Sequence, residues 1–350
     1  MGGFKDIFEP VCIVALFTAG ALINSRSRRP ILCQDKDAFA TPKGWQSPIK
    51  RAQSPSSMVI PRLDGHILSR FLDRFPFLME ILYWNLTYWL YQLARAFSAY
   101  CIRGNDAVMA TATRHALQIR DLEIHLGIAV EKPLQDAVLA HCPRLMDVLA
   151  TVYYSHITVG VAFLVYCYTY LPFRRFAAIR RTLFLDNWIA FAVLTAWRTT
   201  PPRLLPYDPY GYVDVLHSGP GGSGTGSVWT NNRFQLTIAA MPSLHFGTSL
   251  FLAVSLWRFS PHAWLRAIAF LWPAAMLFTI LATANHWILD AVAGVFVVAA
   301  GWRFNHLVGR LVPIEECFFR ITKTERPRPG ESVEVLKREM AKFEDAETLV

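Results

Sequence analysis

Long apolar runs, separated by short segments that carry arginine or proline, make up most of the chain. A membrane-spanning helix needs about 20 apolar residues to cross roughly 30 Å of hydrocarbon. The run at 76–102 is interrupted by Glu80, Asn85 and Arg95 but keeps enough Trp, Tyr and Leu to span. The pattern predicts an all-α fold, an integral membrane helical bundle with about six to seven transmembrane helices. The other runs that approach this length are at residues 148–172, 182–198, 243–257, 263–284 and 286–302.

A shorter apolar stretch near the N-terminus, from Val11 to Ile23, is followed by a basic cluster at residues 26–29. Three interpretations are open: a signal anchor, a short first span or a cleaved leader. A cleaved leader usually carries its positive charge before the apolar stretch rather than after it. We therefore favour residues 1–25 as a retained first span whose first residues lie outside the cytoplasm.

Differences in the content of polar residues divide the rest of the chain into three parts. Residues 26–75 are rich in Pro and Ser and carry ten Lys or Arg, which is typical of a disordered cytoplasmic loop. The membrane domain then covers 76–305. After it, the charged residues 306–350 are expected to form a cytoplasmic tail with one short helix at 331–345.

Two segments of this membrane domain are too polar or too broken to span. Residues 103–147 show helical patterns that are neither long nor apolar enough to cross, which predicts amphipathic helices near the membrane surface. Residues 199–240 contain so much Pro and Gly that a continuous helix is excluded. A loop of this length is usually either functional or disordered.

The distribution of basic residues assigns the two sides of the membrane. Arginines gather in the connections 173–181 and 258–266 and at the start of the tail, and by the positive-inside rule these segments are cytoplasmic. The segments 103–147 and 199–242 and the turn at 283–285 then share the lumenal or extracellular face. The expected localisation is multi-pass, in an endomembrane (Golgi or ER) or the plasma membrane.

The amino-acid composition also favours a membrane environment, and it limits the kinds of binding partner that we expect. The chain is 53% hydrophobic and only 17% charged, which is too apolar for an ordinary soluble domain. The net charge of +9 comes from basic residues grouped by loop, so membrane topology explains it better than a nucleic-acid partner. Six scattered cysteines without CxxC spacing predict neither a metal site nor a disulfide framework. Membrane lipids are the expected partners, no cofactor is expected, and the oligomeric state is left open.

Titratable groups fall at span ends on the predicted lumenal face. His245 lies in MPSLH at the start of one predicted helix, and His286 and Asp290 lie in NHWILD at the start of another. Asp290 follows His286 by four residues, so both share one helix face and the carboxylate can accept the imidazole N–H. Arg203 in PPRLLP lies at the same depth, and free backbone N–H groups at the helix starts would attract an anion.

Two histidines, an arginine and a helix start suit phosphoryl transfer without a metal ion. One imidazole attacks phosphorus to form a phosphohistidine, while the other protonates the departing oxygen. The arginine neutralises charge on the equatorial oxygens of the phosphoryl group. Packing is the alternative explanation for a single intramembrane histidine. Because ionisable residues within spans are costly, three of them on one face favour a catalytic site.

The motifs MPSLHFG and ANHWILDAVAG, about forty residues apart, resemble the second and third signature motifs of the type-2 phosphatidic acid phosphatase superfamily. The PSLH form and the H-x-x-x-D spacing are most similar to the branch that includes inositol phosphorylceramide synthase, an inositolphosphotransferase of sphingolipid metabolism. PPRLLP resembles the arginine-bearing segment of that branch. The resemblance covers roughly residues 95–305.

This resemblance implies a role for each matched residue. His286 would be the nucleophile, Asp290 its orienting partner and His245 the general acid to the leaving group. Arg203 would bind phosphate, and Ser243 with the backbone after it would add hydrogen-bond donors.

Two elements of the family pattern are missing. The third motif of the superfamily often carries Ser-Arg six to seven residues before the nucleophile, where this chain has Thr279 and Ile280, and no lysine-led first motif is recognisable. Some of the phosphate-binding residues of the family therefore have no recognisable counterpart in this sequence. His156 is a candidate substrate-binding residue, with packing as the alternative. Glu123 and Glu131 are better explained as a solvated face or as structural partners than as catalysts.

The leading hypothesis is a membrane-embedded lipid phosphotransferase or lipid phosphate phosphatase that acts on a lipid phosphate substrate through a phosphohistidine, without metal. Water as acceptor gives dephosphorylation, whereas a lipid hydroxyl gives transfer. An isoprenoid (prenyl) diphosphate phosphatase or cyclase is an alternative, because aromatic side chains in the spans are suited to line a prenyl cavity. A non-enzymatic lipid carrier that keeps the anion site is a third, and it predicts no covalent intermediate.

Overall fold

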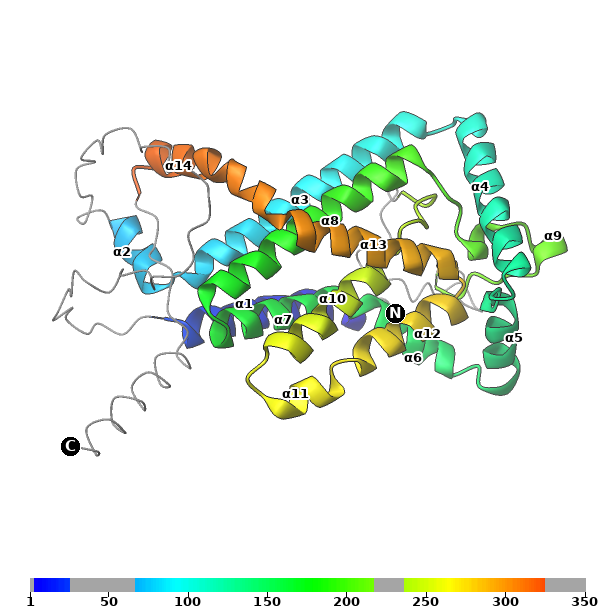
Figure 1. Cartoon of the computed structure of the whole chain (residues 1–350), viewed down its shortest axis with the longest axis horizontal. Helices are drawn as coiled ribbons and strands as arrows, with labels where there is room; N and C mark the ends of the chain where they lie inside the picture. The colour runs from blue at the N-terminus through cyan, green and yellow to red at the C-terminus, as the bar shows by residue number, and fades with distance from the viewer. Residues whose placement is uncertain (1–2, 26–66, 217–235, 325–350) are drawn as a thin grey trace, which may run out of the picture.

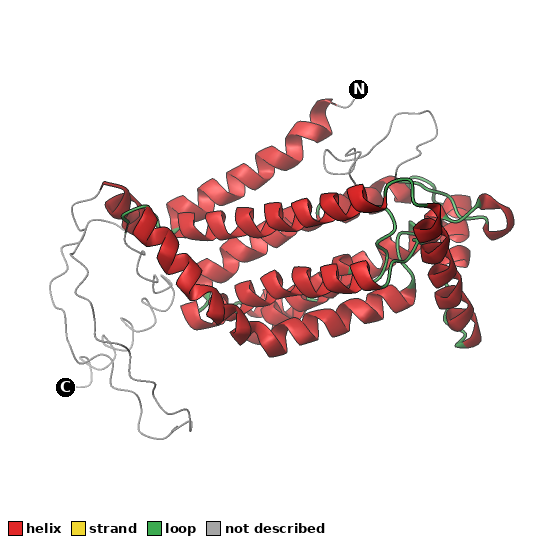
Figure 2. Ribbon diagram, turned by 90° about the horizontal axis from the view of Figure 1, so that it is seen from above, coloured by secondary structure: helices red, strands yellow, loops and turns green. Residues whose placement is uncertain are grey.

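The computed structural model describes residues 3–25, 67–216 and 236–324, and these segments are almost entirely helical (Figure 1, Figure 2). No strand occurs in these segments, where an isolated bridge joins Thr199 and Ala239. The prediction of an all-α fold is therefore confirmed.

A group of helices runs along the longest axis of the molecule and forms its bundle (Figure 1, Figure 2). Their order and positions follow the predicted apolar runs. They are α1 (Gly3–Ile23), α3 (Phe77–Ile102), α6 (Leu145–Tyr154), α7 (His156–Tyr170), α8 (Phe173–Ala196), α10 (Leu244–Phe259), α12 (Leu271–Ala282) and α13 (Ile288–Phe304).

Helix α8 begins earlier than the sequence pattern predicted. Its apolar run starts at residue 182, yet the helix begins at Phe173, directly after Pro172. The additional turns are rich in arginine, and Nη1 of Arg180 lies 2.7 Å from both carboxylate oxygens of Glu80 on α3. This ion pair explains how charged side chains are accommodated between two packed helices.

Two helical segments of the described chain are long and apolar enough to cross a membrane: Ala263–Ala282, with 20 residues, and Ile288–Ile321, with 34. A third is formed if α6 and α7, which meet at 47°, count as one broken span. The other long helices fall short because α10 has only 16 residues, while α3 and α8 carry charged and polar residues that lower their hydropathy. The predicted total of six to seven spans is not confirmed by these helices.

Helix α1 belongs to the packed core. Its buried side chains Ile13, Phe17 and Ala21 share a hydrophobic cluster with Phe77 of α3 and Val161 of α7. That residues 1–25 form a retained first span, and how it is oriented in a membrane, stay predictions.

Other helices cover one end of the bundle, at the right of Figure 1: α4 (Asp106–His125), α5 (Glu131–His141) and α9 (Tyr207–Tyr210), which the 3-10 helix η1 (Pro202–Leu204) precedes. Helices α4 and α5 confirm the helical patterns predicted within residues 103–147. Asn105 caps α4, because its side chain accepts the N–H of Val108 at 3.2 Å. Their place at a membrane surface stays a prediction.

Helix α2 lies toward the opposite end and corrects one expectation. Residues 26–75 are expected to form a partly disordered loop without a helix, but ILSRFLDR places apolar residues at helical spacing and forms one. The remainder of that loop, the Gly-rich run within 217–235 and the tail helix predicted at 331–345 lie outside the described residues. The other elements are α2 (Ile67–Arg74), α11 (Ala263–Ile268), η2 (Asn305–Leu311) and α14 (Val312–Ile321).

Candidate active site

Helices α10 and α13 cross with their backbones in contact near their N-termini. A Cβ atom on Gly247 would lie 2.5 Å from the carbonyl oxygen of Gly294, and a Cβ atom on Gly294 would lie 2.3 Å from that of Ser243. Only glycine permits so close an approach. The N–H of Ser243 also donates to the carbonyl oxygen of Asp290 at 2.9 Å. The crossing therefore brings the MPSLH and NHWILD motifs together.

The turn between α12 and α13 places His286. Helix α12 ends in a Schellman motif, in which the N–H groups of Ala284 and Asn285 bond back to carbonyl oxygens of the last turn, each at 3.0 Å. Ala284 has a φ of 51°, the left-handed conformation that glycine usually takes at this position. Its carbonyl oxygen accepts the N–H of Arg203 at 2.9 Å. The turn therefore ties PPRLLP to Ala284, two residues before His286.

A backbone carbonyl holds the imidazole of His286. Its Nδ1 lies 2.8 Å from the carbonyl oxygen of Ala240 and 3.6 Å from Oδ2 of Asp290. Because a carbonyl oxygen can only accept, Nδ1 carries a proton, and Nε2 of the neutral ring keeps its lone pair. The sequence spacing predicted that His286 donates to Asp290, but in the structure its acceptor is the carbonyl oxygen of Ala240. Oδ2 of Asp290 instead accepts the N–H of Trp287 at 2.9 Å and supports the ring through its charge.

His245 lies in a cluster of rings that comes from several helices. Its ring stacks on that of Tyr153 from α6, with centroids 4.1 Å apart, and lies 5.0 Å from the ring of His156 at the start of α7. The ring centroid of His286 is 5.8 Å away. Because Tyr153 and His156 flank the break between α6 and α7, the bend there sets how they meet His245. His156 is therefore a neighbour of the two motif histidines.

Arg203 is anchored on two sides of its guanidinium. Its Nε donates to Oδ1 of Asn285 at 2.8 Å, and its Nη1 donates to Oδ2 of Asp214 at 2.7 Å. The ion pair is largely buried, with side chains 8% and 14% exposed. Arg203 is thereby fixed beside His286. Within the described residues its Nη2 has no partner and can donate to a ligand.

Two carboxylates from the covering helices occupy the N-terminus of α13. Glu131 accepts the N–H of Ile288 at 2.9 Å, and Glu123 accepts the N–H of Leu289 at 2.8 Å. Both glutamates are buried, so the expectation of a solvated face is wrong and that of a structural partner holds. The free donors that the sequence predicted at this helix start are therefore already bonded within the protein.

By contrast, the N-terminus of α10 has backbone N–H groups that are available to a ligand. The side chain of Ser243 caps the helix, with Oγ 3.4 Å from the N–H of Phe246. Among the described residues, no acceptor takes the N–H groups of Leu244 and His245, the first two positions of the helix. These two groups lie at the positive end of the helix dipole, next to an imidazole, and are suited to phosphate oxygens.

The two glutamates that cap α13 have perturbed acidities. Burial, together with the nearby charges of Glu131 and Asp290, raises the pKa of Glu123 from 4.5 to about 8. Burial also raises the pKa of Glu131, although the N–H groups that it binds oppose the shift. Because three carboxylates meet at the first turn of α13, a proton held by the glutamates relieves their mutual repulsion.

We expect the folded protein to lose stability as the pH rises from about 4.5 to about 8. In this window folded Glu123 holds a proton that the unfolded chain has released, so rising pH favours the unfolded state. Glu123→Gln keeps an acceptor oxygen but cannot ionise. Its thermal unfolding midpoint in detergent should therefore depend less on pH than that of the wild type. Equal pH slopes in the two proteins would contradict the raised pKa.

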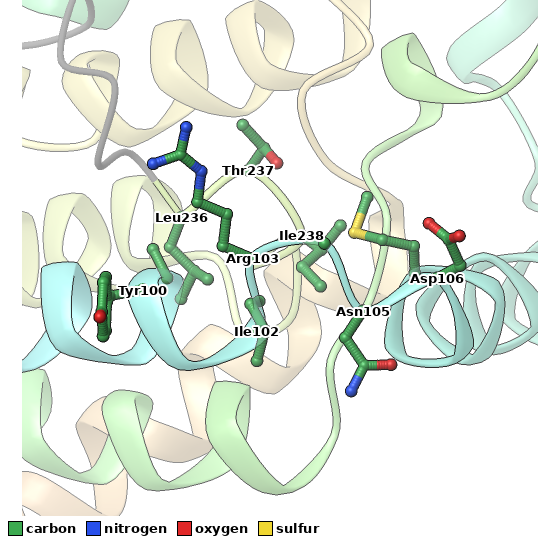
Figure 3. A pocket seen from close by; sticks show the side chains of 11 residues that line it. Tyr100, Ile102, Arg103, Asn105, Asp106, Leu236, Thr237 and Ile238 are labelled. Atoms are coloured by element: carbon green, nitrogen blue, oxygen red, sulfur yellow. The ribbon is translucent and has the colours of Figure 1, made fainter.

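A groove of about 230 Å³ lies at the corner between α3 and α4 (Figure 3). Its lining includes Arg103 and Asp106 at the corner, and Leu236 and Ile238 from the segment that leads to Ala240. Neither motif histidine lines it, so the groove is separate from the ring cluster.

The structure gathers every site residue that the sequence predicted, and it adds others. Among the described residues, no group of three or more His, Cys, Asp and Glu side chains is placed to hold a metal ion. No site role was predicted for Ala240, Asp214 and Asn285. Of these, only Asn285 had a visible signal, because it directly precedes the motif histidine. The predicted residues brought together are His286, His245, Asp290, Arg203, Ser243 and His156.

A family model described as PAP2 superfamily matches residues 117–304. The matched segment contains PPRLLP and both histidine motifs, and it ends with α13. Searches of curated proteins and of solved structures found no match.

Proposed function

Because the chain belongs to the PAP2 superfamily, we propose that it is a membrane-embedded lipid phosphotransferase or lipid phosphate phosphatase that acts through a phosphohistidine at His286. The superfamily supports an enzyme of lipid-type phosphate esters, and the apolar helices support a membrane protein. The observation that carries the proposal is the hydrogen bond from Nδ1 of His286 to Ala240. It leaves Nε2 as the nucleophile, with the ring of a second histidine 5.8 Å away.

In the first step, the Nε2 lone pair of His286 attacks phosphorus, and the bond from phosphorus to the leaving oxygen breaks. His245 gives the leaving oxygen its proton. The phosphorylated ring, with Nδ1 still protonated, is positively charged, and the carboxylate of Asp290 at 3.6 Å stabilises that charge. Arg203 and the N–H groups at the start of α10 stabilise the charge on the non-bridging oxygens.

In the second step, the acceptor oxygen attacks phosphorus and the bond to Nε2 of His286 breaks. His245, now neutral, takes the proton of the acceptor, so both histidines return to their starting states. Water as acceptor releases phosphate, and a lipid hydroxyl gives a new phosphate ester. The site chemistry is the same for both outcomes, and the lipid pocket decides between them.

Transfer of a phosphoinositol group to a sphingolipid, as in the inositolphosphotransferase branch, is the finer form of the proposal. The PSLH form of the second motif and the H-x-x-x-D spacing of the third support it. We also propose that the bundle crosses an endomembrane or the plasma membrane about six to seven times, with the site on the lumenal or extracellular side. The arginines in the first turns of α8, and those at the end of α10 and in α11, support this orientation.

Purified protein in lipid, incubated with a panel of phospholipids, lipid phosphate monoesters, ceramide and prenyl diphosphates, tests the function. Mass spectrometry of the products is expected to show a lipid that has lost its phosphate or passed its phosphorylated headgroup to ceramide. Turnover of prenyl diphosphates alone would instead support a prenyl diphosphate enzyme. Lipid binding without any product across the panel would support a carrier.

A further inference from the structure

Apart from the proton that His245 donates in the proposed first step, the site residues described above offer no positive charge that is left unpaired. Arg203 is already paired with Asp214 at 2.7 Å, so its charge is balanced before a substrate arrives. Asp290, Glu123 and Glu131 add carboxyl groups at the same end of the bundle. A phosphate monoester carries between one and two negative charges near neutral pH, with its second pKa at about 6. Favourable binding of such an anion therefore calls for a second cation.

Arg95, in the C-terminal part of α3, reaches the segment that leads to the site. Its Nη2 lies 3.5 Å from the carbonyl oxygen of Leu236, in the stretch that runs to Ala240, whose carbonyl oxygen holds the ring of His286. From there its charge acts on His245 and on Tyr153, the ring that stacks on His245. Its guanidinium carbon lies 5.7 Å from the ring centroid of Tyr91. The side chain thus brings a positive charge toward the site from a helix that carries neither histidine motif.

The guanidinium of Arg95 makes few hydrogen bonds within the protein. Its Nε is buried without a hydrogen-bond partner, and its Nη2 makes only a long contact, 3.5 Å, with the carbonyl oxygen of Leu236. No carboxylate of the described residues forms an ion pair with it. An unpaired charge inside a predicted span is costly and indicates a functional role. A bound phosphate would supply both the counter-charge and oxygen acceptors that match the guanidinium fork.

The matched family segment does not include Arg95. That segment starts at residue 117, after the end of α3. Within it, Thr279 and Ile280 occupy the positions where the superfamily often carries Ser-Arg. An arginine from another helix can take over a missing phosphate contact if its side chain reaches the same place.

We propose that Arg95 is a phosphate-binding residue of this site. Its guanidinium supplies positive charge to the phosphate in addition to that of Arg203 and of the N-terminus of α10. This inference rests on the proposed function, since it assumes that a phosphate ester binds beside His286. It also predicts a charge preference. Monoesters, which carry up to two charges, should depend on Arg95 more than phosphodiesters, which carry one.

The experiment compares Arg95→Gln with Arg103→Gln, which removes the same charge from an exposed position directly after α3 (Figure 3). We would measure KM for a short-chain lipid phosphate monoester and the concentration of vanadate that halves the rate. Arg95→Gln should raise both by about 10- to 100-fold, as expected for loss of a hydrogen bond between charged groups. Arg95→Lys should raise them less, because it keeps the charge but loses the fork. Arg103→Gln should leave both unchanged.

The outcomes separate this inference from the function on which it rests. A wild-type protein without turnover and without vanadate binding overturns the proposed function. An active wild type in which Arg95→Gln matches Arg103→Gln overturns the role of Arg95 alone. So does an equal loss of kcat on monoesters and diesters with unchanged KM, which is the result of a purely structural role. If Arg95→Gln does not fold, Arg95→Lys decides: a several-fold rise in both values supports the inference, and wild-type values overturn it.

Discussion

His286→Ala is expected to abolish turnover of every phosphate ester that the protein accepts. The substitution removes Nε2, the atom that forms the bond to phosphorus, so no covalent route remains. The loss of kcat should be on the order of 10⁴- to 10⁶-fold, as for removal of other enzymic nucleophiles. Steady-state hydrolysis by purified protein in detergent measures it.

His245→Ala should give a smaller defect that depends on the leaving group. A general acid contributes about 10²- to 10⁴-fold, and only where the departing oxygen needs a proton. Nitrophenyl phosphate, whose leaving group departs readily without one, should partly restore His245→Ala but not His286→Ala. Asp290→Asn should fall between the two, because it leaves the ring on Ala240 but removes the charge that supports the phosphorylated imidazole.

Unchanged folding is the control for these variants, measured by size exclusion and by the thermal midpoint. If folded His286→Ala and His245→Ala both keep wild-type turnover on every substrate, the histidines are not catalytic. The carrier hypothesis would then replace the enzyme.

Gly294→Ala is expected to lower activity at least about 10²-fold, although the substituted residue touches no reacting atom. Its Cβ would lie 2.3 Å from the carbonyl oxygen of Ser243, so α10 and α13 must move apart. Since His245 lies on α10 and His286 lies in the turn that leads into α13, the spacing of the two rings changes with the helices. Overpacking of this kind also destabilises by about 1–3 kcal/mol. Turnover and thermal midpoint, measured on the same preparation, record both effects.

Gly160→Ala on α7 is the matched control. A Cβ atom there meets nothing within 4 Å, so the same substitution adds no clash. Alanine in place of a helical glycine should leave activity intact and stabilise by up to about 1 kcal/mol. Wild-type activity in Gly294→Ala would mean that the backbone crossing does not set the geometry of the site.

The helices and the motif histidines could be predicted because their signals are local. Apolar runs of span length and the prolines and arginines between them predicted α3, α10 and α13 closely, while the runs at 148–172 and 263–284 each contain two helices, α6 with α7 and α11 with α12. Ser243 and Asp290 are also local signals, because each caps the helix start that carries or follows a histidine.

The remaining contacts are set by tertiary structure, where sequence spacing carries no signal. Glu123 and Glu131 bind N–H groups that lie 166 and 157 residues further along the chain. The spacing of His286 and Asp290 predicted a direct hydrogen bond, but the carbonyl of Ala240, 46 residues away, is closer to the same proton. A charge such as that of Arg95 was visible only as an interruption of an apolar run.

Isolation of the covalent intermediate tests the central claim most directly. Purified protein is mixed with a lipid phosphate monoester labelled in its phosphoryl group, quenched at alkaline pH, where phosphohistidine survives, and digested for mass spectrometry. The account predicts a labelled phosphoryl group on the peptide that contains His286, and its absence in His286→Ala. Turnover of the same substrate with no label on His286, or with the label on another residue, would contradict it.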